Sequence, residues 1–300
     1  MGRRAPNSGG MEFADAIAAA PYGRVEQASP LVRRVLARNP SPFTFTGTGT
    51  YIVGRGRVAV IDPGPDDPAH VAALLSALQG ETVAALLVTH THFDHSPASR
   101  PLAAATGAPI LGCAPLALAD DGDRAEAGFD ADHAPDGVMA DGDAVSGPGW
   151  TLRAVATPGH TSNHLCFALA EEEALFSGDH VMGWSTTVVA PPDGDMAAYM
   201  ESLAKVGARS DRRFYPTHGP AIDDPQRLVR GLVAHRRQRE AQILRQLRDG
   251  AAPIPDLVAA VYAAVDRRLW PAAGRSVLAH LLDMEARGLV RRAEERWEAA

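Results

Sequence analysis

The segment Thr89-His90-Thr91-His92-Phe93-Asp94-His95 decides how this sequence is interpreted. It follows a short apolar stretch, residues 82–89, of the kind that forms a strand buried on both faces. His90, His92 and Asp94 are spaced two apart, so their side chains point the same way in extended chain. From composition, the pattern H-x-H-x-D-H is expected roughly 0.001 times in such a chain. The segment therefore predicts a metal site at the end of a strand.

Further candidate ligands occur where predicted strands end or turns form. They are found in Pro158-Gly159-His160-Thr161, Ser177-Gly178-Asp179-His180 and Pro216-Thr217-His218-Gly219-Pro220. Imidazole and carboxylate ligands without cysteine suit Zn²⁺, with Mn²⁺ or Fe as alternatives. The two cysteines, Cys113 and Cys166, are far apart, so the sequence indicates neither a disulfide framework nor a thiolate zinc site.

Composition places the chain among ordinary globular proteins. Of its 300 residues, 46% are hydrophobic and 22% are charged, which argues against a disordered or fibrous chain. The longest apolar run, residues 84–88, is too short to span a membrane, and the N-terminus does not resemble a signal peptide. We therefore expect a soluble, cytoplasmic protein with no membrane partner. The sequence leaves its oligomeric state open.

Charge gives a second constraint on partners. The formal net charge is −7, and the basic residues are arginines apart from Lys205. An acidic chain has no global attraction for nucleic acid, although a local basic patch remains compatible with it. A role in reading DNA is therefore not expected.

The order of predicted elements indicates a mixed α/β protein followed by helices. Strands are predicted at residues 50–54, 57–61, 108–113, 151–156, 164–170 and 174–177, and helices at 68–78 and 96–106. We expect a loose N-terminal leader at residues 1–25, a catalytic domain at 26–224 and a helical domain at 225–300. In the last of these, helices are predicted at 225–247, from 254 and at 271–287, before a short strand at 289–292.

The order and spacing of these motifs resemble the metallo-β-lactamase-fold hydrolase superfamily over residues 50–220. The resemblance implies a four-layer αββα sandwich with its site at the strand ends. Carried over to this chain, His90, His92 and His160 would hold one metal. Asp94, His95 and His218 would hold a second, and Asp179 would bridge the two.

This ligand set implies a mechanism. Two Zn²⁺ ions, two carboxylates and a bridging hydroxide leave the site with one net positive charge. Metal lowers the pKa of bound water to about 7 and polarises a carbonyl or phosphoryl oxygen. We expect hydrolysis by the bridging hydroxide without a covalent enzyme intermediate, with Asp94 as the catalytic residue that also orients the hydroxide.

The C-terminal segment resembles a winged-helix-like domain found in one subgroup of this superfamily. That subgroup includes endoribonucleases that act on single-stranded RNA and thioesterases of polyketide pathways. The segment Gly47-Thr-Gly-Thr-Tyr-Ile-Val-Gly54 also resembles the subgroup's N-terminal strand, with Gly49 in place of a usual Asn. We expect the domain to pack against the catalytic domain and line the cleft rather than to contact RNA.

Three functions follow from these observations. The leading hypothesis is a dinuclear-zinc hydrolase of a small acyl substrate such as an ester, thioester or lactam. The first alternative is a metal-dependent endoribonuclease. The second is a glyoxalase II-like thioester hydrolase, which shares the metal motif but has a different C-terminal domain.

The remaining histidines receive more ordinary interpretations. His164 and His180 either support the ligands or pack in the core. Tyr199 is expected in the core. The other four are expected on the surface or on a helix face: His70, His133, His235 and His280.

Overall fold

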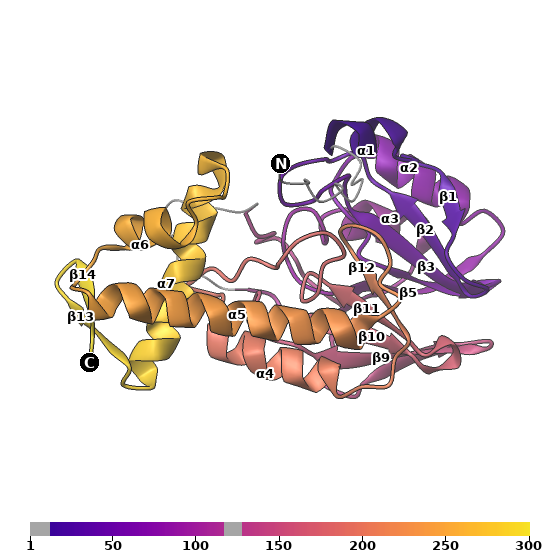
Figure 1. Ribbon diagram of the computed structural model, residues 1–300. Helices are drawn as coiled ribbons and strands as arrows, with labels where there is room; N and C mark the ends of the chain where they lie inside the picture. The colour runs from indigo at the N-terminus through magenta and orange to yellow at the C-terminus, as the bar shows by residue number, and fades with distance from the viewer. Residues whose placement is uncertain (1–12, 117–127) are drawn as a thin grey trace, which may run out of the picture.

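Two β-sheets face each other in the first 220 residues of the computed structural model, which describes residues 13–116 and 128–300 (Figure 1). The seven-stranded sheet has the order β1-β2-β3-β4-β5-β6-β7, with bounds Val25–Gln27, Val32–Leu36, Gly49–Arg55, Arg57–Ile61, Thr82–Val88, Ile110–Gly112 and Gly137–Val138. The five-stranded sheet has the order β12-β11-β10-β9-β8, with bounds Arg213–Pro216, Ala174–Gly178, Leu165–Leu169, Trp150–Ala156 and Ala144–Gly147.

The inner faces of the two sheets form the main hydrophobic core. Tyr51 and Ile61 from the first sheet pack with Trp150, Phe167 and Phe176 from the second, and all five are buried. Burial of large apolar and aromatic side chains is the dominant stabilising contribution to such a sandwich. It holds the ends of strands from both sheets in fixed positions.

Helices cover the outer faces of the sandwich, which confirms the expected αββα architecture. Helices α2 (Pro68–Ala77) and α3 (Ser99–Thr106) pack on the seven-stranded sheet, and α4 (Met196–Gly207) and α5 (Pro225–Arg248) cover the other (Figure 1). Helix α3 begins three residues later than expected, because residues 92–96 form a hydrogen-bonded turn that brings His95 into the site.

Part of the expected loose leader is ordered. Residues 13–19 form helix α1 (Phe13–Ala19), and Tyr22 forms a β-bridge with Leu36. The alanine-rich sequence of this stretch has a high helix propensity, which explains the difference. Residues 1–12 of the leader lie outside the described part of the chain.

The C-terminal module has its own small core. It contains α6 (Ile254–Val261), the 3₁₀ helix η2 (Arg267–Leu269), α7 (Trp270–Ala286) and the hairpin β13–β14 (Val290–Ala293 and Arg296–Ala299). Val277 and Trp297 pack there with Ile243 and Leu247 of α5. The N-terminal half of α5 instead packs on α4 through Val229 and Leu232. One helix therefore contributes to both cores.

None of the helices within the described residues is long and apolar enough to cross a membrane.

Candidate metal centre

The seven predicted ligands come from loops at the ends of strands in both sheets, and the structure brings all of them together. Their ligand atoms form three groups in which all atoms lie within 4.8 Å of one another. The groups are His90, His92 and His160; His90, His95 and Asp179; and Asp94, His95 and His218.

The first group is a convergence of three imidazole nitrogens. His92 Nδ1 lies 3.0 Å from His90 Nε2 and 3.2 Å from His160 Nε2. The other ring nitrogens are already used: His160 Nδ1 donates to the Val188 carbonyl, 2.7 Å away, and His90 Nδ1 donates to the Thr89 hydroxyl, 3.0 Å away. This leaves the two Nε2 atoms as lone-pair acceptors that face His92. Such an arrangement suits a shared cation.

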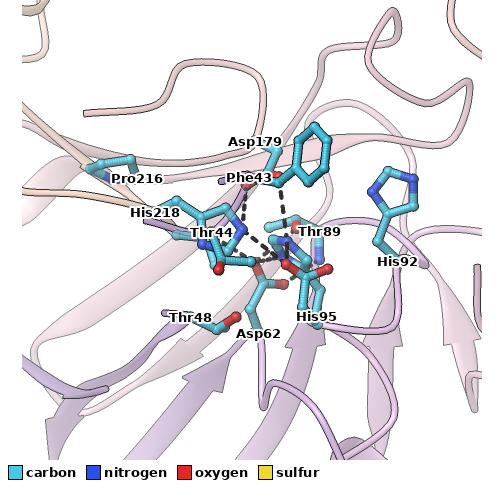
Figure 2. Close-up of polar contacts among 12 residues, drawn as sticks. Phe43, Thr44, Thr48, Asp62, Thr89, His92, His95, Asp179, Pro216 and His218 are labelled. Atoms are coloured by element: carbon cyan, nitrogen blue, oxygen red, sulfur yellow. Dashed lines mark hydrogen bonds and ion pairs between the residues drawn. The ribbon is translucent and has the colours of Figure 1, made fainter. Parts of the chain in front are cut away.

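The second group joins histidines to carboxylates. His218 Nε2 lies 3.0 Å from Asp94 Oδ2 and 3.4 Å from Asp179 Oδ1. His95 Nε2 lies 3.6 Å from an oxygen of each of the same two carboxylates. Figure 2 shows Asp179, His95 and His218 pointing toward one another. Asp179 also lies 3.8 Å from His160 Nε2, so it faces both groups.

Unpartnered polar atoms at this centre fit a bound metal. His95 Nε2 and Asp179 Oδ1 are buried and form no hydrogen bond within the described residues. Buried polar atoms without partners are costly, and native proteins rarely leave them so. Nitrogen and carboxylate oxygen donors without thiolates match the preferences of Zn²⁺ and of Mn²⁺ or Fe. The residues present therefore fit divalent metal.

The electrostatics of the centre depend on its carboxylates. Burial acts to lower the pKa of His95, but Asp94, Asp179 and Asp62 outweigh burial and raise that pKa well above its usual value. The same balance raises the pKa of His218 to about 10, mainly through Asp179. Burial acts to raise the pKa values of Asp94 and Asp179, but the histidines outweigh it and lower both. Without metal, protons on His95 and His218 compensate the two carboxylates.

Sequence reasoning missed the residue that supports this centre. Asp62, at the end of β4, is fully buried and accepts hydrogen bonds from His95 Nδ1 at 2.9 Å and from the hydroxyls of Thr89 and Thr217 at 2.9 and 2.8 Å (Figure 2). It therefore fixes the ring of His95 and links two ligand segments, residues 89–95 and 216–220. Its positive φ of 48° is tolerated by Asp. In the sequence, the feature that could have indicated this role is the position of Asp62 directly after a predicted strand.

His164 and His180, which the sequence assigned either to ligand support or to core packing, have different roles in the structure. His164 accepts a hydrogen bond from the backbone N–H of Asp179 at 3.1 Å, so it supports a predicted ligand. His180 packs against Tyr199, whose ring centroid lies 5.1 Å away, and Tyr199 is buried in the core as expected.

The remaining histidines are less exposed than expected. His70 and His280 lie on helices, but they and His133 are buried. The reason for His70 is a hydrogen-bonding contact of 2.9 Å with the Thr50 hydroxyl inside the fold. His235 is half-buried beside a pocket.

A cavity of about 470 Å³ opens from the metal centre toward the C-terminal module. Its lining begins at His92, Asp94, His160, Asp179 and His218. The rest of its surface is mostly apolar, although about half of the residues that form it are polar. At the other end, residues of α5 and α7 complete the lining. The C-terminal module therefore lines the candidate active site, as expected from the sequence. A pocket of this size accommodates a small organic molecule.

Comparison with known protein families matches both parts of the chain. Residues 44–218 match a family model described as the metallo-beta-lactamase superfamily. Residues 254–297 match one described as the beta-lactamase associated winged helix domain.

Two relatives and one solved structure illustrate the similarity. An atrochrysone carboxyl ACP thioesterase, dmxR1, from Cryptosporiopsis sp. is 38% identical over 76% of this chain and 66% of its own length. A beta-lactamase-like protein 2 homolog from Drosophila melanogaster is 34% identical over 87% of this chain and 89% of its own. The crystal structure of a beta-lactamase domain protein from Burkholderia ambifaria superposes with a TM-score of 0.79, at 21% identity, over 96% of this chain and 97% of that one.

Proposed function

This chain belongs to the metallo-β-lactamase superfamily and is a metal-dependent hydrolase, and we propose that it is a dinuclear-zinc thioesterase for a small acyl substrate. The observation that carries the proposal is the pocket. The pocket is lined at one side by five of the seven proposed ligands. Its remaining surface is mainly apolar, which fits an acyl group. A relative that is named a thioesterase supports the choice of thioester among acyl substrates.

Five of the proposed ligands are held by a second contact: His90, His95, His160, Asp179 and His218. We assign His90, His92 and His160 to one metal, Asp94, His95 and His218 to the other, and Asp179 to both. The Nδ1 atoms of His160 and His218 donate to the carbonyls of Val188 and Gly47, which fixes the tautomers with Nε2 facing the centre. When bound, the metal ions lower the pKa of water toward about 7 and polarise the substrate carbonyl.

The remaining steps belong to the chain's own residues. The Asp94 carboxylate lines the pocket, so it can accept a hydrogen bond from the attacking water and orient it toward the thioester carbonyl. Met182, Trp184 and Val188 contact the acyl group and exclude bulk water from it. The thiol product has an ordinary pKa near 8.5, so it needs little help to leave as a thiolate.

A second candidate function, the endoribonuclease, is favoured by one surface. The outer face of α5 carries five exposed arginines that form no ion pair with any described residue: Arg227, Arg230, Arg237, Arg245 and Arg248. Such a stripe can attract phosphates. Against this function, Arg287 and Arg291 near the wing are paired with Glu240 and Glu298, both at 2.6 Å. We therefore rank it second.

We do not retain the glyoxalase II-like alternative. Residues 254–297 match a winged helix domain, which is not the C-terminal domain expected of such an enzyme.

The test is a direct assay of the zinc-loaded chain on two substrates in parallel. We expect it to release thiol from acyl-N-acetylcysteamine thioesters and to leave a labelled single-stranded RNA intact. Metal analysis should give two zinc ions per chain. Asp94→Ala should reduce both zinc content and turnover, the latter roughly 1,000-fold, because the variant loses a ligand and a water-orienting group.

Asp66→Ala is the matched control, because Asp66 is an exposed carboxylate in the loop after β4 that contacts none of the ligands. It should keep wild-type zinc content and turnover. RNA cleavage that disappears in metal-free protein and in Asp94→Ala would replace the thioesterase proposal with the endoribonuclease. Full activity of Asp94→Ala on thioesters would remove the role assigned to Asp94.

A further inference from the structure

The end of the pocket formed with the C-terminal module is lined by two arginines of α5, and one of them, Arg236, also reaches Thr187, whose hydroxyl donates to the backbone carbonyl of Asp179. Arg236 and Arg239 reach the cavity from adjacent turns of the helix, and Tyr262, Leu269 and Ala273 complete this end. The first half of the chain contributes none of these five residues. This region of the pocket therefore belongs to the C-terminal module and to the helix that joins it to the sandwich.

Arg236 is a buried cation without a carboxylate partner. It is only 3% exposed, and it lines the pocket. Its guanidinium donates to the Thr187 carbonyl and lies over the ring of Tyr199, 5.1 Å from the centroid. Its Nε is buried and forms no hydrogen bond within the described residues. No acidic side chain described by the structure lies within ion-pairing distance of it.

Arg239 is held in place without being neutralised. It donates to the Val261 carbonyl and to Gln242 Oε1, both at 2.8 Å, and its guanidinium lies 4.6 Å from the centroid of the Tyr262 ring. Among the described residues it too has no ion pair. The next residue, Glu240, pairs instead with Arg287 at 2.6 Å.

The two arginines make this end of the pocket electropositive. Burying a cation without an anion is costly, so such a cation normally has a partner in the functional state. The same positive charges help to lower the pKa values of two neighbouring histidines. Burial first, and then the charges of Arg236 and Arg239, lower the pKa of His235. Burial first, then Arg236, His235, Arg287 and Arg239, lower the pKa of His280 to about 3.

We propose that Arg239, supported by Arg236, binds an anionic group of the substrate, a carboxylate or a phosphate, while the metal centre holds the thioester carbonyl at the other end of the pocket. This inference rests on the proposed thioesterase function. The guanidinium of Arg239 is fixed by a carbonyl, an amide, His235 and an aromatic ring, and among the described residues its Nη2 has no acceptor, so it can donate to such oxygens. Apolar residues that line the same pocket, such as Met182 and Val265, would contact the body of the substrate.

The anion could be part of either half of the thioester. A carboxylate would belong to the acyl group, whereas a phosphate would belong to the thiol that is released. Three probes separate these sources: butyryl-N-acetylcysteamine, which is neutral; glutaryl-N-acetylcysteamine, with an acyl carboxylate; and butyryl-4′-phosphopantetheine, with a thiol-side phosphate.

The experiment compares Arg239→Gln with wild-type protein on these three thioesters. Glutamine keeps a hydrogen-bonding side chain but removes the charge. We expect one of the two anionic thioesters to be the preferred wild-type substrate. For that substrate the variant should raise KM roughly 10- to 100-fold with little change in kcat, and it should leave the neutral thioester unaffected. Arg237→Gln is the matched control, because Arg237 is exposed on the outer face of the same helix turn. It should behave as wild type.

Equal KM values for the neutral and anionic thioesters, or an equal loss on all three in Arg239→Gln, would overturn the inference. So would an effect of Arg239→Gln that is confined to RNA. If no thioester is hydrolysed, the proposed function fails, and the anion site is judged by calorimetry with glutarate and 4′-phosphopantetheine. Binding that Arg239→Gln abolishes and Arg237→Gln preserves supports the site; no binding overturns it.

Discussion

The pKa of a buried histidine is shifted in opposite directions at the metal centre and beside the two arginines of α5. At the metal centre His218 lies against two carboxylates, and its pKa is raised to about 10. Behind the other end of the pocket His280 is equally buried, but its pKa is lowered to about 3. Burial lowers the pKa in both cases, so the neighbouring charges cause the difference. The first region concentrates carboxylates and is suited to cations, whereas the second concentrates guanidinium groups and is suited to anions.

The largest expected effect of these charges is on the pH dependence of zinc affinity. His95 and His218 have raised pKa values, so near pH 7 both carry protons that metal must displace. Zinc affinity should therefore rise with pH, by up to roughly 100-fold per pH unit for two displaced protons. Competition with a chromogenic chelator at pH 6, 7 and 8 measures this slope.

Asp94→Asn sharpens this test. It removes one of the carboxylates that stabilise the protons, so the slope should become shallower, whereas Asp66→Asn should leave it unchanged. An affinity that does not vary between pH 6 and 8 would contradict the charge balance described for the metal end.

Asp62→Asn should produce the next largest effect, because Asp62 fixes His95 without facing the pocket. Asp62 Oδ2 accepts from His95, Thr89 and Thr217, while Oδ1 accepts from the backbone N–H of Thr89 at 2.8 Å. An amide has only one acceptor oxygen, so it cannot satisfy the donors on both sides. Zinc affinity should fall roughly 10- to 100-fold, as for other groups that orient metal ligands. The affinity is measured by the same chelator competition, and a melting curve shows that the variant folds. Unchanged affinity in folded protein would show that His95 does not need this contact.

His280→Leu should produce the smallest effect and tests the positive end. Because the pKa of His280 is lowered on folding, the unfolded chain binds more protons below pH 6.5, and stability falls as the pH drops toward about 3. Between pH 6.5 and 5 this histidine costs about 2 kcal/mol. The variant should therefore lose less thermal stability than wild type over that range. An identical loss in both proteins would mean that His280 is protonated in the folded state.

The metal end could be predicted from the sequence because its residues are local and distinctive. Four ligands lie within six consecutive positions, and the others sit in short turns that directly follow strands. The αββα fold was implied by the resemblance to the superfamily that the same motifs carry. The helical C-terminal module was visible in its apolar periodicity.

The positive end could not be predicted in the same way. Arg236 and Arg239 lie in a helix that contains several other arginines, and periodicity does not indicate which of them face a pocket. Asp62 was not identified as a supporting residue, because its partners lie in two segments that are distant in sequence, residues 89–95 and 216–220. Long-range contacts determine both features, and a single sequence does not record them.

Helix α5 has a consequence for how the molecule unfolds. With 24 residues it is about 36 Å long, and its two halves belong to different hydrophobic cores. Loss of either core would leave half of the helix without its packing partners. The sandwich and the C-terminal module are thereby coupled into one cooperative unit, which would melt in a single transition rather than two.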